Sequence, residues 1–80
     1  MERYYVLITL RESSAATGVE VAERIRSFDG ITSADAVVST SLDVIAVVEV
    51  HGDDAHTRAM SKIRAGPEVR RAVVCPVSAH

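Results

Sequence analysis

The segment from Asp43 to Val50 reads Asp-Val-Ile-Ala-Val-Val-Glu-Val and gives the strongest strand signal in the chain. Successive side chains of a strand point to opposite faces of its sheet, so a strand with one wet face should alternate apolar and polar residues. Apart from Glu49, the even-numbered and odd-numbered positions from 44 to 50 are equally apolar. The sheet that contains this strand therefore needs cover on both faces.

Three further segments favour strands and two favour helices. Residues with high strand propensity are enriched in 3–11, 31–39 and 69–77. Apolar residues recur at helical spacing from about Thr17 to Phe28 and from about residue 53 to Arg64. The order strand-helix-strand-strand-helix-strand is characteristic of a ferredoxin-like α+β fold, with a four-stranded antiparallel sheet and two helices on one face. This reading assigns residues 1–80 to a single domain, without a linker or an internal repeat.

The helix boundaries carry their own signals. Thr17 and Glu20 have the spacing of a capping box, in which the threonine hydroxyl accepts from the Glu20 N–H and the glutamate reaches back. Asp29-Gly30 should end this helix, because glycine adopts the left-handed conformation without steric cost. Asp53-Asp54 supplies an acidic N-cap for the second helix, and Gly66-Pro67 ends that helix.

Two helices cover only one face of a sheet, so the second apolar face needs another partner. A chain of 80 residues buries only about 60% of the surface that it exposes when unfolded, and such domains often rely on disulfides, metals or partner subunits. The single cysteine, Cys75, excludes an internal disulfide. We therefore expect a homodimer that pairs sheet to sheet. The alternative is a monomer that tolerates a few exposed valines.

Charge and hydropathy narrow the functional classes. Nine lysine and arginine residues against eleven aspartate and glutamate residues give a net charge of −2, and the basic residues form no dense run. Nucleic-acid binding relies on a basic stripe or a stacking platform, so we expect no direct contact with DNA. No apolar stretch approaches the roughly 20 residues of a membrane span, and the N-terminus lacks signal-peptide features. A cytoplasmic location is expected, in agreement with the unpaired thiol.

Metal-binding and catalytic patterns are sparse. The only metal-like cluster in the sequence comprises His51, Asp53, Asp54 and His56. A strand end and a helix start would separate its two histidines, so no metal and no other cofactor is expected. Cys75 lies among valines and is interpreted as an inert strand residue. Because no nucleophile–base arrangement is evident, we expect no enzymatic activity and assign no catalytic residue.

Glu49 is the one charged residue within the apolar segment 44–50. It would either pair across the sheet with an arginine such as Arg11 or act as a polar element of the dimer interface. The sequence leaves both interpretations open.

Five short motifs follow one another in a characteristic order. Residues 4–8 read Tyr-Tyr-Val-Leu-Ile and residues 21–25 read Val-Ala-Glu-Arg-Ile. Residues 39–45 read Ser-Thr-Ser-Leu-Asp-Val-Ile, and Asp29-Gly30-Ile31 and Pro67-Glu68-Val69 each follow a predicted helix. Along nearly its whole length the chain thereby resembles the effector-binding domain, or RAM module, of the Lrp/AsnC family of transcription regulators. That family has Pro-Gly-Val after each helix and a Thr-Gly-x-Tyr/Phe-Asp turn, which Thr40 and Asp43 match.

The resemblance implies a stand-alone ligand-binding module that lacks the helix-turn-helix usually preceding this domain. Such modules pair sheet to sheet into dimers, often assemble further into rings, and bind a small effector, typically an amino acid, between subunits. Carried over by position, the ligand-binding residues are Ser39, Thr40, Ser41, Leu42 and Asp43. A full-length Lrp/AsnC-type regulator is the implied protein partner.

Alternatives remain for the site and for the function. The Asp43 carboxylate would either anchor the ammonium group of a ligand or cap the turn by accepting from nearby amides. Ser41 replaces the family's turn glycine, and residues 72–74 are apolar where the family has hydroxyl groups. An assembly-only module with a decayed pocket is one alternative function. A small enzyme of the dimeric α+β barrel type, a monooxygenase or isomerase, is another.

Overall fold

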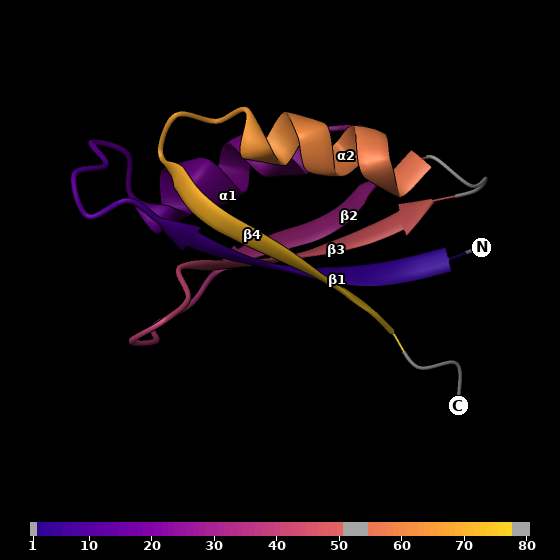
Figure 1. Ribbon diagram of the computed structural model, residues 1–80, viewed down its shortest axis with the longest axis horizontal. Helices are drawn as coiled ribbons and strands as arrows, with labels where there is room; N and C mark the ends of the chain where they lie inside the picture. Colours follow the sequence, from indigo (N-terminus) through magenta and orange to yellow (C-terminus); the bar gives the residue numbers. More distant parts are fainter. Residues whose placement is uncertain (1, 51–54, 78–80) are drawn as a thin grey trace.

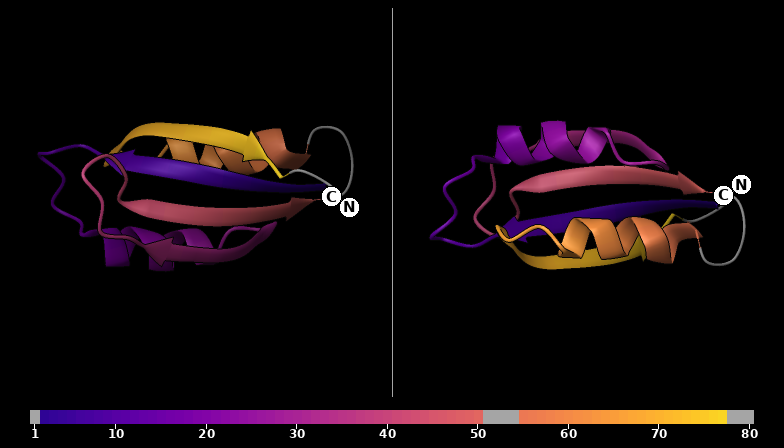
Figure 2. Two further views of the ribbon diagram at one scale, coloured as in Figure 1. Left: turned by 90° about the horizontal axis from the view of Figure 1, so that it is seen from below. Right: turned by 90° about the horizontal axis from the view of Figure 1, so that it is seen from above.

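The computed structural model describes residues 2–50 and 55–77 and has the predicted ferredoxin-like α+β fold (Figure 1). Its elements are β1 (Glu2–Leu10), α1 (Gly18–Arg26), β2 (Ile31–Ala36), β3 (Val44–Val50), α2 (Ala55–Arg64) and β4 (Val69–Pro76). The strands form one sheet in the order β2-β3-β1-β4, and every neighbouring pair is antiparallel. Both helices lie on the same face of this sheet, as the views from below and above in Figure 2 show.

Helix α1 begins as the sequence predicts and ends two residues earlier. The Thr17 hydroxyl accepts from the Glu20 N–H at 3.2 Å, and the Thr17 N–H donates to the Glu20 carboxylate at 3.2 Å. At the other end, the N–H and the hydroxyl of Ser27 both donate to the Arg24 carbonyl oxygen. This cap ends the helix, and Phe28 packs against the core from the turn that follows.

The second strand is also shorter than predicted. β2 stops three residues early, because the chain turns out of the sheet after the Val37 N–H donates to the Asp43 carbonyl oxygen at 3.0 Å. The next residue, Val38, is fully exposed. Helix α2 ends at Arg64, as predicted, whereas its expected N-cap at Asp53-Asp54 lies outside the described residues.

The core lies between the sheet and the helices and is built from alternate strand residues. In β3 the even-numbered residues from 44 to 50 are buried, and the odd-numbered ones are half-buried on the opposite face. The core is apolar, and among the described residues no polar or charged side chain is fully buried. Its members are Val6, Ile8, Val21, Ala22, Ile25, Ala34, Val44, Ala46, Val48, Val50, Ala59, Met60, Ile63, Val69 and Ala72.

The backbone contains an internal two-fold repeat, which corrects the expectation of no repeat. The Arg26 side chain donates to the Ala34 carbonyl oxygen at 2.8 Å. With both positions shifted by 38 (26 to 64, 34 to 72), the Arg64 side chain donates to the Ala72 carbonyl oxygen at 3.0 Å. Shifting the residue numbers by 38 likewise converts the residue pairs between β2 and β3 into the pairs between β4 and β1. Only a few equivalent positions carry the same residue, among them Arg26 and Arg64, so the repeat is clearer in the hydrogen bonds and the strand register than in the sequence.

Replacing Thr17 removes the capping box, so we expect Thr17→Ala to lower the free energy of unfolding by about 1 kcal/mol. Urea unfolding at one fixed protein concentration measures this change, since any assembly makes the midpoint depend on concentration. Thr57→Ala, at an exposed position in α2, is the matched control and should change the free energy by less than about 0.5 kcal/mol. An equal loss in both variants would contradict the capping role of Thr17.

Candidate functional site

The turn between β2 and β3, residues 37–43, extends away from the sheet on the side opposite the helices (Figure 1). The five predicted ligand-binding residues lie in it: Ser39, Thr40, Ser41, Leu42 and Asp43. Within the turn, the Ser41 N–H donates to the Ser39 hydroxyl oxygen at 3.3 Å. The Thr9 hydroxyl donates to the Ser41 carbonyl oxygen at 2.7 Å, which fixes the turn to β1.

Asp43 is held through both its backbone and its side chain. Its N–H donates to the Ile8 carbonyl oxygen at 2.9 Å, and its carbonyl oxygen accepts from the Val37 N–H. The carboxylate oxygen Oδ2 accepts from the Leu10 N–H at 2.8 Å. Of the two roles considered for this carboxylate, the structure shows the capping role, because Oδ2 satisfies a backbone amide at the end of β1.

A β-bulge at the start of β4 brings two arginines to the same region. The β1–β4 register shifts just after Thr9, which pairs with Arg71. Val69 and Ala72 both face the core, and the two residues between them, Arg70 and Arg71, are both exposed. In a regular strand these neighbours would point to opposite faces, and the bulge redirects one of them.

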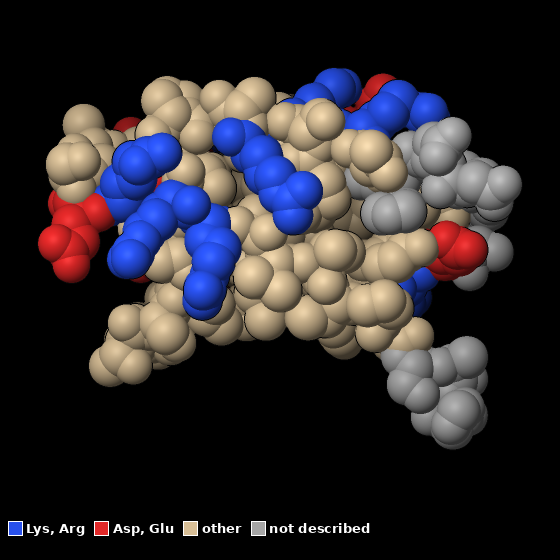
Figure 3. Space-filling model, viewed as in Figure 1, with Lys and Arg blue, Asp and Glu red and all other residues tan. Residues whose placement is uncertain are grey.

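A shallow hollow of about 340 Å³ lies between the turn and this bulge. Thr9, Thr40 and Ser41 contribute its hydroxyl groups, and Arg70 and Arg71 contribute its guanidinium groups. Figure 3 shows lysine and arginine side chains gathered at this end of the molecule, where β4 begins. Guanidinium and hydroxyl groups both donate hydrogen bonds to carboxylate oxygens, so the hollow has the chemistry to receive an anionic group.

Only part of the predicted site reaches this region. Thr40 and Ser41 line the hollow, and Asp43 lines an adjoining hollow of about 380 Å³. Ser39 and Leu42 line neither of the two. The predicted segment therefore contributes three side chains. The remaining polar groups come from β1, from β4 and, in the adjoining hollow, from Arg11, Glu12 and Ser14 of the loop after β1.

Sequence reasoning missed Thr9, Arg70 and Arg71. Regular alternation places the two arginines on opposite faces, and a bulge is decided by pairing with a neighbouring strand rather than by local composition. One signal was available: Val69 and Ala72 are apolar residues three positions apart, a spacing that interrupts strand alternation. The two arginines that line the hollow thus directly precede the apolar stretch 72–74.

The sheet face opposite the helices is apolar at its centre, and no helix in the described part of the chain covers it (Figure 1). Its central residues belong to β1 and lie directly opposite residues of β3 on one side and of β4 on the other. We call these residues the outer patch: Tyr5, Leu7, Ile45, Val47, Val73 and Cys75. Tyr5 and Val73 are 43% and 40% exposed. The outer patch is the second apolar face that the sequence predicts.

Glu49 lies on the same face, beyond one end of the outer patch, and its partner is Arg3. The two residues are opposite each other in the β1–β3 register, and the carboxylate lies 3.1 Å from the guanidinium. The arginine suggested by the sequence, Arg11, instead donates to the Pro67 carbonyl oxygen at 3.1 Å. An ion pair this close to solvent adds at most about 1 kcal/mol, so its clearer consequence is a polar border to the outer patch.

Acidic, histidine and cysteine side chains do not gather in the described part of the chain. Within it, no group of three such residues is placed to hold a metal ion. The cluster discussed above, His51, Asp53, Asp54 and His56, lies outside the residues whose side chains are described. None of the helices described is both long enough and apolar enough to cross a membrane.

Comparisons with known proteins establish the fold. No known sequence family and no curated protein matches the chain. TTHA0845 from Thermus thermophilus has a TM-score of 0.84 at 17% identity, over 100% of this chain and 96% of that one. The hypothetical protein PHS023 from Pyrococcus horikoshii gives 0.82 at 21%, over 100% and 93%. FFRP-DM1 gives a TM-score of 0.80 at 20% identity, over 98% of this chain and 100% of that one.

Asp43→Ala leaves the Leu10 N–H without its acceptor, so we expect the free energy of unfolding to fall by about 1–3 kcal/mol. Asp43→Asn keeps an oxygen acceptor at the same place and should cost less than about 1 kcal/mol. Urea unfolding measures both losses, and hydrogen exchange at the Leu10 amide reports the bond itself. The capping role fails if the two variants lose equally and Leu10 exchanges at the wild-type rate in both.

Proposed function

We propose that this chain is a non-enzymatic effector-binding module of the Lrp/AsnC type. Two copies pair through their outer patches, and a small effector of the amino-acid class binds between subunits near the β2–β3 turn. The observation that carries the proposal is the hollow in which turn hydroxyl groups meet Arg70 and Arg71. Effector binding then shifts the equilibrium of subunit assembly, or the binding of the module to a full-length regulator of the same family.

The outer patch supports the pairing of two copies. Six apolar residues on three adjacent strands remain in water in a single chain, and their burial is favourable by about 25 cal/mol per Å². The β2–β3 turn extends on the same side and carries the fully exposed Val38 (Figure 1). A second sheet that docks on the outer patch therefore lies beside this turn, which places the hollow near the subunit boundary.

The groups around the hollow suit an amino acid. Arg70 and Arg71 can form charge-assisted hydrogen bonds with a carboxylate, and these are stronger than bonds between neutral groups. The bond from Leu10 engages Oδ2 of Asp43, which leaves Oδ1 to pair with an ammonium group. A free amino acid carries both of these charged groups.

The remaining parts of the proposal concern partners and location. Assembly of dimers into rings, a cytoplasmic location and a regulator partner rest on the family resemblance and on the fold shared with FFRP-DM1. The proposal that the chain does not bind DNA directly rests on basic residues that already have partners within the chain. Five arginines already make internal ion pairs or hydrogen bonds: Arg3, Arg11, Arg24, Arg26 and Arg64.

The enzyme alternative calls for a polar cavity between the sheet and the helices. That space is filled by apolar side chains among the described residues, with Ile8 and Ile63 the largest that are fully buried. This packing favours a binding module over an enzyme. The assembly-only alternative differs in one respect, since it predicts the dimer without a ligand.

Val73→Asp places a charge in the outer patch, on an edge strand where the monomer exposes the side chain. We expect the variant to sediment at the chain mass of 8.6 kDa and the wild type at twice that mass. Val19→Asp is the matched control, because Val19 is an exposed valine on α1, in the helix layer. A monomeric wild type at about 100 μM, or dissociation of both variants, would refute pairing through the outer patch.

Thermal unfolding of the wild type with each of the twenty amino acids at millimolar concentration tests the effector. A ligand present at 100 times its dissociation constant adds about 2.7 kcal/mol, if one site is bound in the native state only. For a domain of this size the midpoint then rises by several degrees or more. We expect a selective rise with one amino acid or one chemical class of them.

Arg71→Gln should abolish the rise in thermal midpoint that the amino acid causes. The ligand-free midpoint should stay nearly unchanged, since Arg71 is exposed. Arg71→Lys, which keeps the positive charge at the same position, should retain most of the rise. A full rise in Arg71→Gln would contradict the proposed location. A dimer whose midpoint responds to no amino acid would be the assembly-only module instead.

A further inference from the structure

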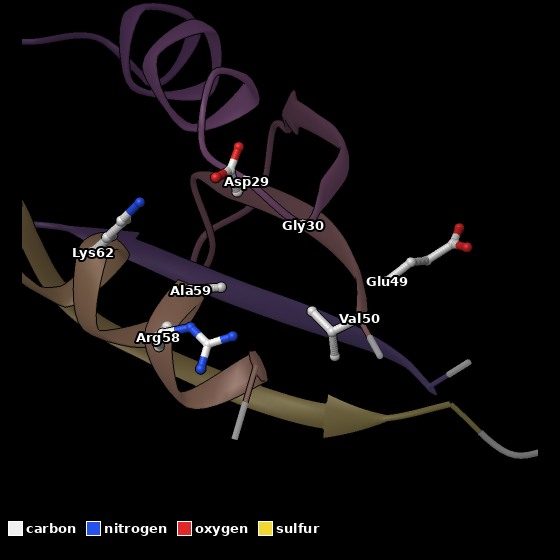
Figure 4. Close-up of a pocket in the computed structure, with 7 residues that line it drawn as sticks. All are labelled: Asp29, Gly30, Glu49, Val50, Arg58, Ala59 and Lys62. Carbon is white, nitrogen blue, oxygen red and sulfur yellow. The ribbon is translucent and has the colours of Figure 1, made fainter. Parts of the chain in front are cut away.

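A second hollow lies at the other end of the sheet from the β2–β3 turn. Its volume is about 350 Å³, and it is bordered by the α1–β2 turn, the end of β3 and one side of α2. Figure 4 shows Arg58 and Lys62 extending from α2 on one side, with Asp29 and Gly30 across from them. Glu49 points away from this group. Among the described residues, the hollow therefore presents two positive charges from one helix opposite the carboxylate of Asp29.

The internal repeat shows what occupies the equivalent place in the other half. The same 38-position shift relates Arg24 to Lys62 and Gly30 to Glu68. The backbone confirms the correspondence: Arg11 N–H donates to the Glu68 carbonyl oxygen at 2.8 Å, as Glu49 N–H donates to the Gly30 carbonyl oxygen at 2.9 Å. In that half the Arg24 guanidinium pairs with the Glu68 carboxylate.

The two halves thus carry their turn carboxylate at adjacent positions: Glu68 in one half and Asp29, which corresponds to Pro67, in the other. The Glu68 side chain is only 10% exposed, so it fills its site, whereas Gly30 has no side chain to fill the corresponding place. Gly30 also has a φ of 87°, a backbone conformation that side-chain-bearing residues rarely adopt. Lys62 therefore faces a place where the fold has, in its other half, an acid partner.

A second charge difference adds to the first. Arg58 stands where the repeat has Glu20, whose carboxylate in α1 is used by the capping box. Arg58 and Lys62 are four positions apart and lie on the same side of α2. In the described part of the chain neither forms an ion pair. Val50 and Ala59, both buried, add apolar atoms to the lining of the hollow.

We propose that this hollow binds a small organic anion, whose carboxylate or phosphate group takes the place that Glu68 has in the other half. Lys62 supplies the direct counter-charge, as Arg24 does for Glu68, and Arg58 adds the second. Asp29 sets a limit on the charge of the ligand, because a large polyanion would be repelled by it. The inference does not rest on the proposed effector site, which lies at the other end of the sheet.

Amide chemical-shift titration of the full chain at constant ionic strength tests this inference, with succinate in one series and inorganic phosphate in the other. We expect saturable shifts at Gly30, Val50 and Lys62. Saturation by succinate alone identifies a carboxylate ligand, and saturation by phosphate identifies phosphate chemistry. Lys62→Gln should weaken the binding at least about tenfold, the loss of roughly one charge-assisted hydrogen bond.

Lys62→Arg is the matched control, because it keeps the positive charge at the same position and should leave the titration nearly unchanged. Shifts that grow linearly without saturation, or that persist unchanged in Lys62→Gln, overturn the inference. Saturable shifts that centre on Thr40 and Arg71 also overturn it, while supporting the effector site. If the saturable shifts are confined to Gly30, Val50 and Lys62, the inference holds even when no amino acid alters the thermal midpoint.

Discussion

The sheet has two apolar faces and the chain has helices for only one of them. Because alternate residues of β1 and β3 point to opposite faces, the residues that build the core also fix the position of those that remain outside it. A shift of the register by one residue would exchange the two sets without reducing the apolar area left in water. The excess of apolar surface is therefore a property of the sequence, and only a second cover can remove it.

Local signals predicted most of this fold. The capping box at Thr17 acts within one turn of helix, and the alternation in the segment 44–50 acts within one strand, so both are readable without knowledge of the partner elements. The early end of β2 and the bulge beside Arg70 depend on pairing between distant strands. The same holds for the bond from Leu10 to Asp43, whose partners are 33 residues apart. The candidate site lies where those long-range contacts meet, and this is why the sequence indicated its turn but not its arginines.

The internal repeat explains how one backbone plan can present two different surfaces. Equivalent hydrogen bonds fix the course of each half, so the side chains at equivalent exposed positions are free to differ. At one end, the bulge of β4 exposes two arginines where β2 has Thr32 and Ser33. At the other end, Gly30 stands in place of Glu68, Asp29 in place of Pro67 and Arg58 in place of Glu20. Both ends thereby gain positive charge in a chain whose net charge is −2, and charge concentrated in this way attracts anions over short distances only.

In the proposed assembly, ligand binding and subunit pairing act on the same elements. The turn is tied to β1 through Thr9 and Leu10, while neighbouring residues of β1, Tyr5 and Leu7, belong to the outer patch. An effector that orders the turn beside a docked partner binds the dimer more tightly than the monomer. By linkage it must then strengthen dimerisation by the same factor. Regulation in such a module needs no separate mechanical device, because the differential affinity of one site for the two assembly states is sufficient to couple them.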